Sequence, residues 1–406
     1  EREGKTMPGF ELIGQEEKKE VLDILETGIW MRYGFDQERR GVFKVRELEE
    51  AFCRYHGVSH ALGVTSGSAA LKVALEALDV GPGDEVIVPA FTFVATYEAV
   101  LEVGAIPVMA DVDDSLNLSS EDIPAKITDR TKAVIPVHMC GAGARIDGIL
   151  EAARNHGLLV LEDNAQSLGG AFRGRKLGTF GDMATFSFDF YKTITTGEGG
   201  MVLTNRKDLY DRADGYHDHG HDHNPAVSRA LEGRSILGFN YRMNEFQGAV
   251  GLAQFRKLDT IVARQRENKA FLKERLGGVS GVTFRHLPDP EGDTATFLGF
   301  HLPDGPSAKA FQGALKEEGI DSIYYKENLW HYAPNWEHLI AWSTANSKKF
   351  PFINTLNPRK ATYDREAIPH AEALLARTLF MAVPVILTNE RKDALARGID
   401  KAGKKG

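Results

Sequence analysis

The stretch HALGVTSGSAALKVALEALDVGPGDEVIVP, at residues 60–89, contains two apolar runs with a helical pattern between them. The first run, HALGVT at 60–65, leads into the small residues Ser66 and Gly67, and the second run is EVIVP at 85–89. Between the runs, apolar side chains share one helical face: Ala70, Val73, Ala74, Ala77 and Leu78. The stretch therefore predicts a strand, a tight turn, a helix and a second strand, which is the unit that builds parallel sheets.

The same alternation continues on both sides of this stretch. Further strands are predicted at 106–112, 132–137, 158–163 and 201–204, and helices at 16–27, 44–56, 96–103 and 147–156. Strands that alternate with helices form parallel sheets whose two faces are both covered. We therefore predict an α/β fold with a mainly parallel sheet and helices on both of its faces.

After residue 204 the alternation stops. A histidine-rich loop is followed by one long helical pattern at 245–276, by strands at 282–285 and 296–302, and by helices at 307–318 and 370–381. Ser307 is the expected N-cap of the first of these two helices. The pattern predicts a large domain over residues 1–255, which includes the N-terminal segment, and a smaller α+β domain over residues 256–406.

The composition excludes several classes of protein. The 406 residues carry 49 Lys and Arg against 57 Asp and Glu, a net charge of −8, so general binding to nucleic acid is not expected. No apolar run reaches the roughly 18 residues that cross a bilayer, and the start, EREGKTMPGFELIG, lacks the apolar core of a secretory signal. Cys53 and Cys140 show no CxxC spacing. We expect a cytoplasmic protein that does not bind membranes.

Chemically distinctive residues concentrate between residues 161 and 204. Asp163 ends a predicted strand, at the edge of an open α/β sheet where ligands bind. Lys192 follows the run FSFDFY and is followed in turn by TTGEGG at 195–200. Pyridoxal phosphate needs such a set, namely a lysine that forms a Schiff base and moves a proton, and an acid that pairs with the pyridine nitrogen. We predict these two catalytic roles for Lys192 and Asp163.

Small residues at the start of a predicted helix suit an anion. Gly67, Ser68 and Ala69 stand where backbone N–H groups and the positive end of the helix dipole favour a phosphate. Ser187, shortly before Lys192, adds a hydroxyl group. A serine and a glycine before a helix also serve as a simple cap, so the pattern alone leaves both interpretations open.

Six ordered motifs resemble those of one enzyme family. They are TSGSAAL at 65–71, VIVPAFTFVAT at 86–96, EDNAQSLG at 162–169, GTFGDMATFSF at 178–188, KTITTGEGG at 192–200 and GFNYRMNEFQGAVGLAQ at 238–254. Over nearly its whole length the chain is similar to the DegT/DnrJ/EryC1/StrS sugar aminotransferases, which are fold-type I pyridoxal phosphate enzymes. The resemblance implies a mainly parallel seven-stranded sheet in a large domain, a smaller C-terminal α+β domain, and pyridoxal 5'-phosphate as cofactor.

The resemblance also implies a role for each matching residue. Lys192 would form the Schiff base, Asp163 would pair with the pyridine nitrogen, and Gln166 would lie near the ring hydroxyl. Phe93 would be the aromatic ring that stacks on the cofactor. Ser68, Ala69 and Ser187 would contact its phosphate, and Asn240 would reach the phosphate from the neighbouring subunit. A contact supplied by the neighbour implies a homodimer with shared active sites.

The activity implied by the resemblance is transfer of an amino group from L-glutamate to a keto or aldehyde sugar. One relative in this family has histidine in place of the lysine and catalyses dehydration, so the presence of Lys192 favours transamination. Three alternatives stay open. They are an aminotransferase for a nucleotide-linked keto-sugar, a pyridoxal-phosphate-dependent sugar dehydratase, and a non-catalytic regulator or metal-binding protein on the same fold.

The segment YHDHGHDHN at 216–224 has histidines at alternate positions. Imidazole and carboxylate groups are competent metal ligands, but a solvated loop would fit the same pattern. The resemblance implies a third interpretation, in which His219 and Gly220 match the His-Gly that ends the family's loop beside the active site and form a wall of the neighbouring subunit's substrate pocket. We favour the pocket wall and predict no metal. The predicted substrate contacts are His219, His221, Tyr33 and Trp330.

Two further segments narrow the resemblance. Together with PDPEGDTATFL at 288–298 and LWHYAPNWEHL at 329–339, the histidine-rich segment resembles the aminotransferases that make 8-amino-3,8-dideoxy-manno-octulosonate, an amino sugar of lipopolysaccharide. That resemblance implies the 8-oxo form of 3-deoxy-manno-octulosonate as the amino acceptor. Its carboxylate would need cations or several donors, for which the candidates are His219, His221, Arg229 and Arg234.

Overall fold

The computed structural model describes residues 8–224, 226–352, 356 and 361–405. Residues 1–7, which form half of the stretch in which we predict no secretory signal, lie outside the described residues. Among the helices of the described residues, none is both long enough and apolar enough to span a bilayer.

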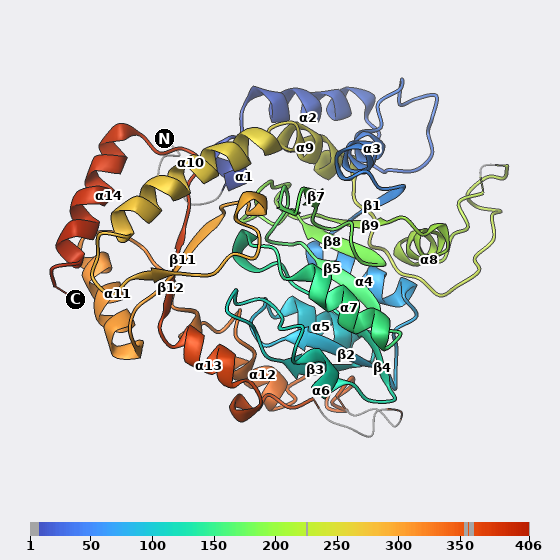
Figure 1. Ribbon diagram of the computed structural model, residues 1–406. Helices are drawn as coiled ribbons and strands as arrows, with labels where there is room; N and C mark the ends of the chain where they lie inside the picture. The colour runs from blue at the N-terminus through green and yellow to red at the C-terminus, as the bar shows by residue number, and fades with distance from the viewer. Residues whose placement is uncertain (1–7, 225, 353–355, 357–360, 406) are drawn as a thin grey trace.

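Seven strands form the central sheet of the part of the chain that the structure describes, in the order β1-β9-β8-β5-β4-β2-β3 (Figure 1). The strands from β8 to β3 in this order are parallel, whereas β9 is antiparallel to both of its neighbours. The predicted fold class is confirmed. The strands are β1 (His60–Val64), β2 (Glu85–Pro89), β3 (Ile106–Ala110), β4 (Thr131–Val134), β5 (Leu159–Asp163), β8 (Met183–Ser187) and β9 (Gly200–Thr204).

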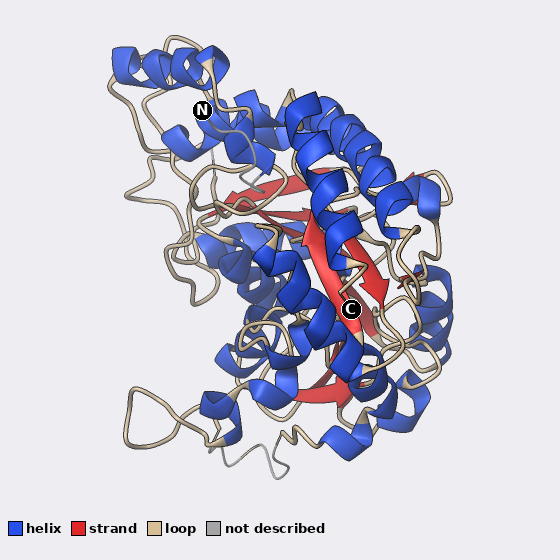
Figure 2. Ribbon diagram, turned by 90° about the vertical axis from the view of Figure 1, so that its left-hand side faces the viewer, coloured by secondary structure: helices blue, strands red, loops and turns tan. Residues whose placement is uncertain are grey.

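Helices cover both faces of this sheet (Figures 1 and 2). Strand β2 shows why, because the side chains of Val86 and Val88 enter one core and that of Ile87, between them, enters the core on the opposite face. Such continuous apolar runs are typical of strands buried on both faces. On the first face lie α4 (Gly67–Ala77), α5 (Ala95–Glu102) and α8 (Lys207–His217), and on the second lie α3 (Lys44–His56), α7 (Ile146–Asn155) and α9 (Glu245–Phe255).

The C-terminal half adds a three-stranded antiparallel sheet, in the order β10-β11-β12 among the described residues. Its strands are β10 (Thr283–Phe284), β11 (Phe297–His301) and β12 (Thr378–Ala382), and it packs with α10 (Leu258–Leu276), α11 (Gly305–Glu317) and α14 (Asn389–Ala402). The remaining elements are α1 (Pro8–Glu11), α2 (Gln15–Thr27), α6 (Ile123–Lys126), α12 (Glu337–Ile340), α13 (Pro369–Leu375), β6 (Ala171–Phe172) and β7 (Arg175–Lys176). Helix α2 lies alongside α9 (Figure 1).

The sequence pattern does not predict two of the elements, β8 and α8. Strand β8 follows β5 through the short β6–β7 hairpin, without a helix between them, so the strand and helix alternation does not predict it. Helix α8 occupies a segment that we expected to be part of a loop. Its apolar residues Leu209 and Ala213 are buried against the large sheet, and this tertiary contact stabilises a helix that has few apolar positions.

The helix predicted at 370–381 is wrong in its second half, which forms β12. In this strand Leu379 and Met381 pack in the core of the small sheet, whereas Phe380 packs in the core of the large sheet. A short run that is apolar on both faces fits a strand and a buried helix equally well. The pairing of β12 with β11, which is distant in sequence, decides between the two.

The single long helix predicted at 245–276 is divided into α9 and α10. The Lys257 N–H bonds to the carbonyl of Gln254, three residues earlier, so the α-helical ladder is interrupted there. The amine of Lys257 lies 2.8 Å from a carboxylate oxygen of Glu17 in α2. This long-range ion pair is invisible to helical periodicity.

The N-cap predicted at Ser307 is also wrong. Helix α11 begins at Gly305, and its N-cap is Asp304, whose Oδ1 accepts the Ser307 N–H at 2.8 Å. Aspartate and serine are both good caps, and here the more N-terminal of the two occupies the capping position.

Residues on both sides of the predicted domain boundary share one core. Tyr325, Tyr332, Trp336 and Ile368 follow residue 256 in sequence, but they are buried in the core of the large sheet. The division between residues 255 and 256 stays a prediction.

Glu162, which precedes Asp163 in β5, organises the turn before β8. Its fully buried carboxylate accepts the N–H groups of Gly178 at 2.9 Å, Phe180 at 2.6 Å and Gly181 at 2.8 Å. This contact places β8 beside β5 and so brings Ser187 to the same edge of the sheet as Asp163.

Glu162→Ala should lower the free energy of unfolding by about 3 kcal/mol or more, because one buried and two partly buried N–H groups lose their acceptor. Urea denaturation followed by circular dichroism measures the change. Glu151→Ala, at an exposed position of α7, is the control and should stay within about 0.5 kcal/mol of the parent protein. A similarly small loss in Glu162→Ala would show that this carboxylate does not hold the turn.

Candidate active site

Asp163 lies at the carboxyl end of β5, between β4 and β8, and is 4% exposed. Its Oδ2 accepts a hydrogen bond from Thr96 Oγ1 at 3.2 Å, and its Oδ1 accepts one from the Ala165 N–H at 3.0 Å. Burial raises the pKa of Asp163, while the Ala165 N–H, the charge of Lys192 and the Thr96 hydroxyl only partly oppose this rise. The carboxyl group is thus buried and oriented from two sides.

Lys192 lies in the turn after β8, where its N–H donates to the carbonyl of Asp189 at 3.0 Å. Its Nζ lies over the ring of Phe93, 5.7 Å from the ring centroid. Burial lowers the pKa of Lys192, and the charges of Asp189 and Asp163 offset this only in part. Because the charges of Lys192 and Asp163 act on each other, the two side chains lie close together. We call the group formed by Lys192, Asp163 and Phe93 the Lys192 pocket.

The N-terminus of α4 lies against the end of β8. Ser66 caps the helix, since its Oγ accepts the Ala69 N–H at 3.0 Å. The N–H groups of Gly67 and Ser68 come first in the helix, where no carbonyl of the same helix is in reach. A Cβ atom at Gly67 would lie 2.9 Å from Ser187 Oγ, so a glycine is needed for this approach. The result is a cradle of N–H and hydroxyl donors that suits an anion.

Gln166 borders the Lys192 pocket on the chain segment after Asp163. Its Oε1 accepts the Cys140 N–H at 2.9 Å, and the Cys140 thiol lies 3.8 Å from the hydroxyl of Tyr325. Burial raises the pKa of Cys140 to about 11, so its thiol is neutral. The amide nitrogen of Gln166 is left to donate to a ligand.

Trp330 and His331 cover Phe93 from the C-terminal half of the chain. Their carbonyls accept the N–H groups of Val94 and Thr92, at 2.9 Å and 3.1 Å. Trp330 is 61% exposed, and its ring stacks on that of Phe93 with centroids 6.0 Å apart. The His331 ring centroid lies 5.3 Å from that of Phe93. Burial, followed by the charge of Lys192, lowers the pKa of His331 to about 3. His331 is therefore a neutral side chain beside Lys192.

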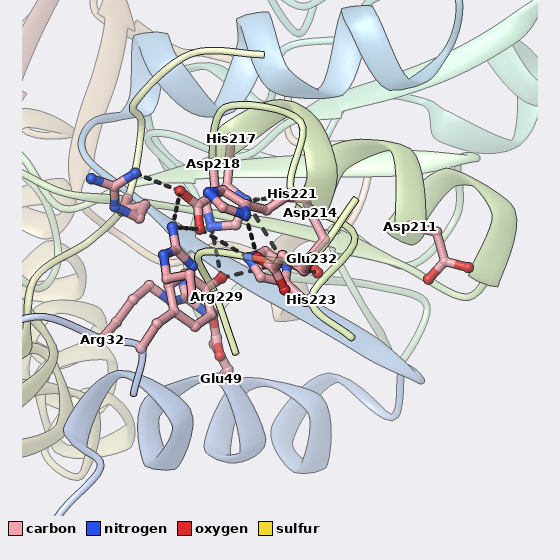
Figure 3. A network of polar contacts seen from close by, with 12 residues as sticks. Arg32, Glu49, Asp211, Asp214, His217, Asp218, His221, His223, Arg229 and Glu232 are labelled. Atoms are coloured by element: carbon pink, nitrogen blue, oxygen red, sulfur yellow. Dashed lines mark hydrogen bonds and ion pairs between the residues drawn. The ribbon is translucent and has the colours of Figure 1, made fainter. Parts of the chain in front are cut away.

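A second group of polar side chains, the Asp218 cluster, lies at the end of α8 (Figure 3). Two predicted substrate residues are bonded within it: the Tyr33 hydroxyl is 3.0 Å from His217 Nε2, and His221, which is 6% exposed, pairs with Glu232. The cluster consists of Arg32, Tyr33, Asp214, His217, Asp218, His221, His223, Arg229, Glu232 and Arg242. Within the described ranges, no group of three or more His, Cys, Asp or Glu side chains is arranged to hold a metal ion.

His219 and Asn240 lie at the margin of the Asp218 cluster. His219 is exposed, with its ring 6.2 Å from that of Phe239. Asn240 is also exposed, its backbone pairs with that of Asp218, and its Oδ1 accepts the Arg242 N–H at 3.3 Å. The structure thus places Lys192, Asp163 and Phe93 together, and it places His219 and Asn240 in a different region of the same chain.

The profile of the DegT/DnrJ/EryC1/StrS aminotransferase family matches residues 11–351. The chain belongs to this family. GDP-perosamine synthase of Vibrio cholerae is 36% identical over 353 residues, which are 84% of this chain and 89% of that protein. GDP-perosamine synthase of Caulobacter vibrioides is 47% identical over 243 residues, which are 59% of this chain. The match covers 64% of that relative, less than two thirds of its length.

Solved structures agree with this membership. The crystal structure of 3-amino-5-hydroxybenzoic acid synthase superposes with a TM-score of 0.79 at 29% identity, over 97% of both chains. The predicted resemblance to the DegT/DnrJ/EryC1/StrS aminotransferases is confirmed.

The DegT/DnrJ/EryC1/StrS aminotransferases depend on pyridoxal phosphate, and the Lys192 pocket fits this cofactor. It offers a primary amine, a buried carboxyl group and an aromatic face, in Lys192, Asp163 and Phe93. A Cβ atom at Gly67 would collide with Ser187, so the glycine lets the backbone donors of α4 lie beside the Ser187 hydroxyl. These are the functional groups that an aldehyde on a phosphorylated pyridine ring requires.

Sequence reasoning missed three side chains of the pocket. Thr96 orients Asp163, and Cys140 and Tyr325 line the side near Gln166. Thr96 ends the quoted motif VIVPAFTFVAT, so that motif could have suggested it. Tyr325 comes from a segment far away in sequence, and no local signal connects it with the pocket.

Gly67→Ala should weaken the binding of pyridoxal phosphate by about tenfold or more, because the new methyl group crowds Ser187 and narrows the anion cradle. Titration of the cofactor-free protein, followed by absorbance, measures the affinity. Gly313→Ala is the matched control, since a Cβ atom there meets open space. Equal affinities in both variants would contradict a phosphate site at α4.

Proposed function

We propose that this protein is a pyridoxal-phosphate-dependent aminotransferase that moves the amino group of L-glutamate to a keto or aldehyde sugar. The observation that carries the proposal is the Lys192 pocket, where an amine with a lowered pKa lies over an aromatic ring and close to a buried carboxyl group. The family membership of the chain supports the same reaction class.

We propose the following roles, which the positions of the side chains support. When bound, pyridoxal phosphate supplies an aldehyde that holds amines as imines and a ring that accepts an electron pair. Lys192 would hold it covalently, and Asp163, oriented by Thr96, would keep the ring nitrogen protonated. Phe93 would stack on the ring. The other proposed contacts are Gln166 at the ring hydroxyl, and Gly67, Ser68, Ala69 and Ser187 around the phosphate.

The lowered pKa of Lys192 suits the movement of a proton. A lysine amine is protonated near neutral pH unless its surroundings disfavour the charge. Burial in the Lys192 pocket disfavours the charged amine. It therefore raises the fraction of neutral amine, which can attack a carbonyl or accept a proton. His331, which lies close to Lys192, is neutral and therefore adds no second positive charge beside the Lys192 amine.

We further propose a homodimer in which Asn240 of one subunit reaches the cofactor phosphate of the other. Asn240 follows a segment with large apolar side chains in water: Ile236 is 40% exposed, Leu237 is 91% exposed and Phe239 is 62% exposed. Contiguous exposed apolar side chains of this kind are typical of an interface. In this dimer, His219 and Tyr33 would contact the substrate that is bound in the active site of the partner subunit.

For the acceptor we propose the 8-oxo form of 3-deoxy-manno-octulosonate, in the synthesis of a lipopolysaccharide sugar in the cytoplasm. The support is the resemblance of the histidine-rich segment and of residues 288–298 and 329–339 to aminotransferases for this sugar. Trp330, on the outer face of Phe93, would contact the sugar. A GDP-linked keto-sugar is the second candidate, which the GDP-perosamine synthases among the relatives favour.

L-Glutamate added to the holoenzyme should convert the absorbance band of bound pyridoxal phosphate to that of the pyridoxamine form and release one equivalent of 2-oxoglutarate. Lys192→Ala should bind the cofactor without a covalent bond and slow this conversion by about 1,000-fold or more, because the proton carrier is lost. Stopped-flow absorbance measures both rates. A full rate in Lys192→Ala, or a protein that takes up no cofactor, would contradict the proposed reaction.

Catalytic turnover with glutamate should require the correct acceptor. We expect continuous release of 2-oxoglutarate with the 8-oxo sugar acid, and kcat/KM at least about 100-fold lower with a GDP-linked keto-sugar, because a site built for one polar substrate leaves its donors unpaired with the other. A coupled assay for 2-oxoglutarate measures both values. The reverse preference would select the nucleotide-linked acceptor and leave the amino-transfer proposal intact.

A further inference from the structure

Asp218 is a fully buried carboxylate with three cationic neighbours. Its oxygens accept hydrogen bonds from Nε2 of His223 at 2.9 Å, from Nη2 of Arg229 at 2.5 Å and from Nη1 of Arg242 at 2.5 Å (Figure 3). Burial alone raises the pKa of Asp218, but these bonds and the arginine charges outweigh burial and hold it well below its usual value. The ionised carboxylate thus ties three points of the 218–242 segment to the end of α8.

His223 is bonded to a carboxylate on each side of its ring. Its Nδ1 lies 2.6 Å from Oδ2 of Asp214, and its Nε2 lies 2.9 Å from Oδ2 of Asp218. An ionised carboxylate can only accept, so both ring nitrogens must donate and the ring must be an imidazolium ion. Neither nitrogen then has a lone pair for a metal ion.

The electrostatics of the cluster agree with this geometry. Burial alone lowers the pKa of His223, but the hydrogen bonds and charges of Asp214 and Asp218 outweigh burial and raise it to about 9. The titratable and charged groups around the ring come from α8, α3, the N-terminal segment and the loop before α9: Asp214, His217, Asp218, His221, Glu49, Arg32, Tyr33, Arg229, Glu232 and Arg242.

Tyr33 and His217 fix the ring of His223 in place. The Tyr33 ring stacks on the His223 ring with centroids 4.5 Å apart, and its hydroxyl lies 3.0 Å from Nε2 of His217. Burial and the charge of Arg32 lower the pKa of His217 to about 3, so His217 is neutral. Its Nδ1 donates to the carbonyl of Asp214, which leaves Nε2 to accept from Tyr33.

Two contacts connect Asp218 with Asn240. Their backbones pair in an antiparallel bridge, and Arg242, whose guanidinium bonds to Asp218, donates its N–H to Asn240 Oδ1 at 3.3 Å. This bond occupies the amide oxygen and leaves the NH₂ group of the exposed Asn240 side chain to donate outward. The direction of that donor therefore depends on Asp218 and, through Asp218, on His223.

The two backbone segments approach so closely that side chains would separate them. Gly220 has φ +78°, and a Cβ atom there would collide with the carbonyl of Ile236. A Cβ atom at Gly238 would lie 2.5 Å from the nitrogen of Gly220. The backbone of residues 236–240 therefore packs directly against residues 218–220, so a shift of one segment would move the other.

We propose that Asp218 and the imidazolium form of His223 are positioning residues, which aim the Asn240 amide at the cofactor phosphate of the neighbouring subunit. The inference rests on the shared active site proposed above. It assigns the charged histidine of the 216–224 segment to the assembly of that site, in place of metal binding.

The test is a double-mutant cycle on the dimer of this 406-residue chain, with the affinity for pyridoxal phosphate as readout. His223→Gln keeps a hydrogen-bond donor but loses the charge, and Asn240→Ala removes the proposed phosphate contact. Each should weaken cofactor affinity by about tenfold. The double variant should be no weaker than Asn240→Ala alone, because His223 acts through Asn240.

The outcomes separate this inference from the proposed function. Unchanged affinity in Asn240→Ala would overturn the shared site. A weakened Asn240→Ala beside an unaffected His223→Gln, or additive losses in the double variant, would overturn the positioning role. His286→Gln, at an exposed histidine of the C-terminal half, is the matched control and should bind the cofactor like the parent protein.

A second measurement applies even if the His223 variants do not fold. In the parent dimer labelled with ¹⁵N-histidine, one imidazole should stay doubly protonated at neutral pH and lose its proton only near pH 9. The same resonance should shift to a lower titration midpoint in Asp218→Asn, which removes one of the two carboxylates. A titration in which no imidazole keeps its proton well above the usual histidine pKa would overturn the proposal.

Discussion

The burial of Asp163 at the carboxyl edge of the sheet is the constraint on which the rest of the site depends. A carboxyl group that is 4% exposed costs free energy unless donors and positive charge surround it. Thr96 and the Ala165 N–H supply the donors, and Lys192 supplies the charge. This compensation is incomplete, so the pKa of Asp163 is raised and that of Lys192 is lowered. Both groups therefore exchange protons more readily near neutral pH than they would in water.

The Asp218 cluster balances its charges in the opposite way. Asp218 has three cationic partners, and His223 has two anionic ones, so the charged form of each group is stabilised. Groups held in one charge state do not exchange protons easily, which suits a structural task. The Lys192 pocket and the Asp218 cluster are thus distinguished by how well the charges of their groups are compensated. Burial is common to both clusters.

Much of the fold could be predicted because local sequence patterns determine many of its helices and strands. The stretch at 60–89 shows a strand, turn and helix directly, and α3 and β2 have the predicted bounds. Lys192, Asp163 and Phe93 were recognisable from their motifs, and the structure places them together. Strand β12 was predicted as a helix because an apolar run has no preference until a partner strand is present. Tyr325 was missed for the same reason, since it meets Cys140 only in the folded chain.

The amino-acid sequence by itself determined the fold class, the family and the residues with reactive groups, because backbone propensity, apolar spacing and chemical type are properties of short segments. The tertiary structure alone decided which charges are compensated. The segment 216–224 shows only alternating histidines in sequence, yet in the folded chain His217 is neutral and His223 carries a charge. That difference arises from the carboxylates and the degree of burial around each ring, which depend on residues brought together from distant parts of the chain.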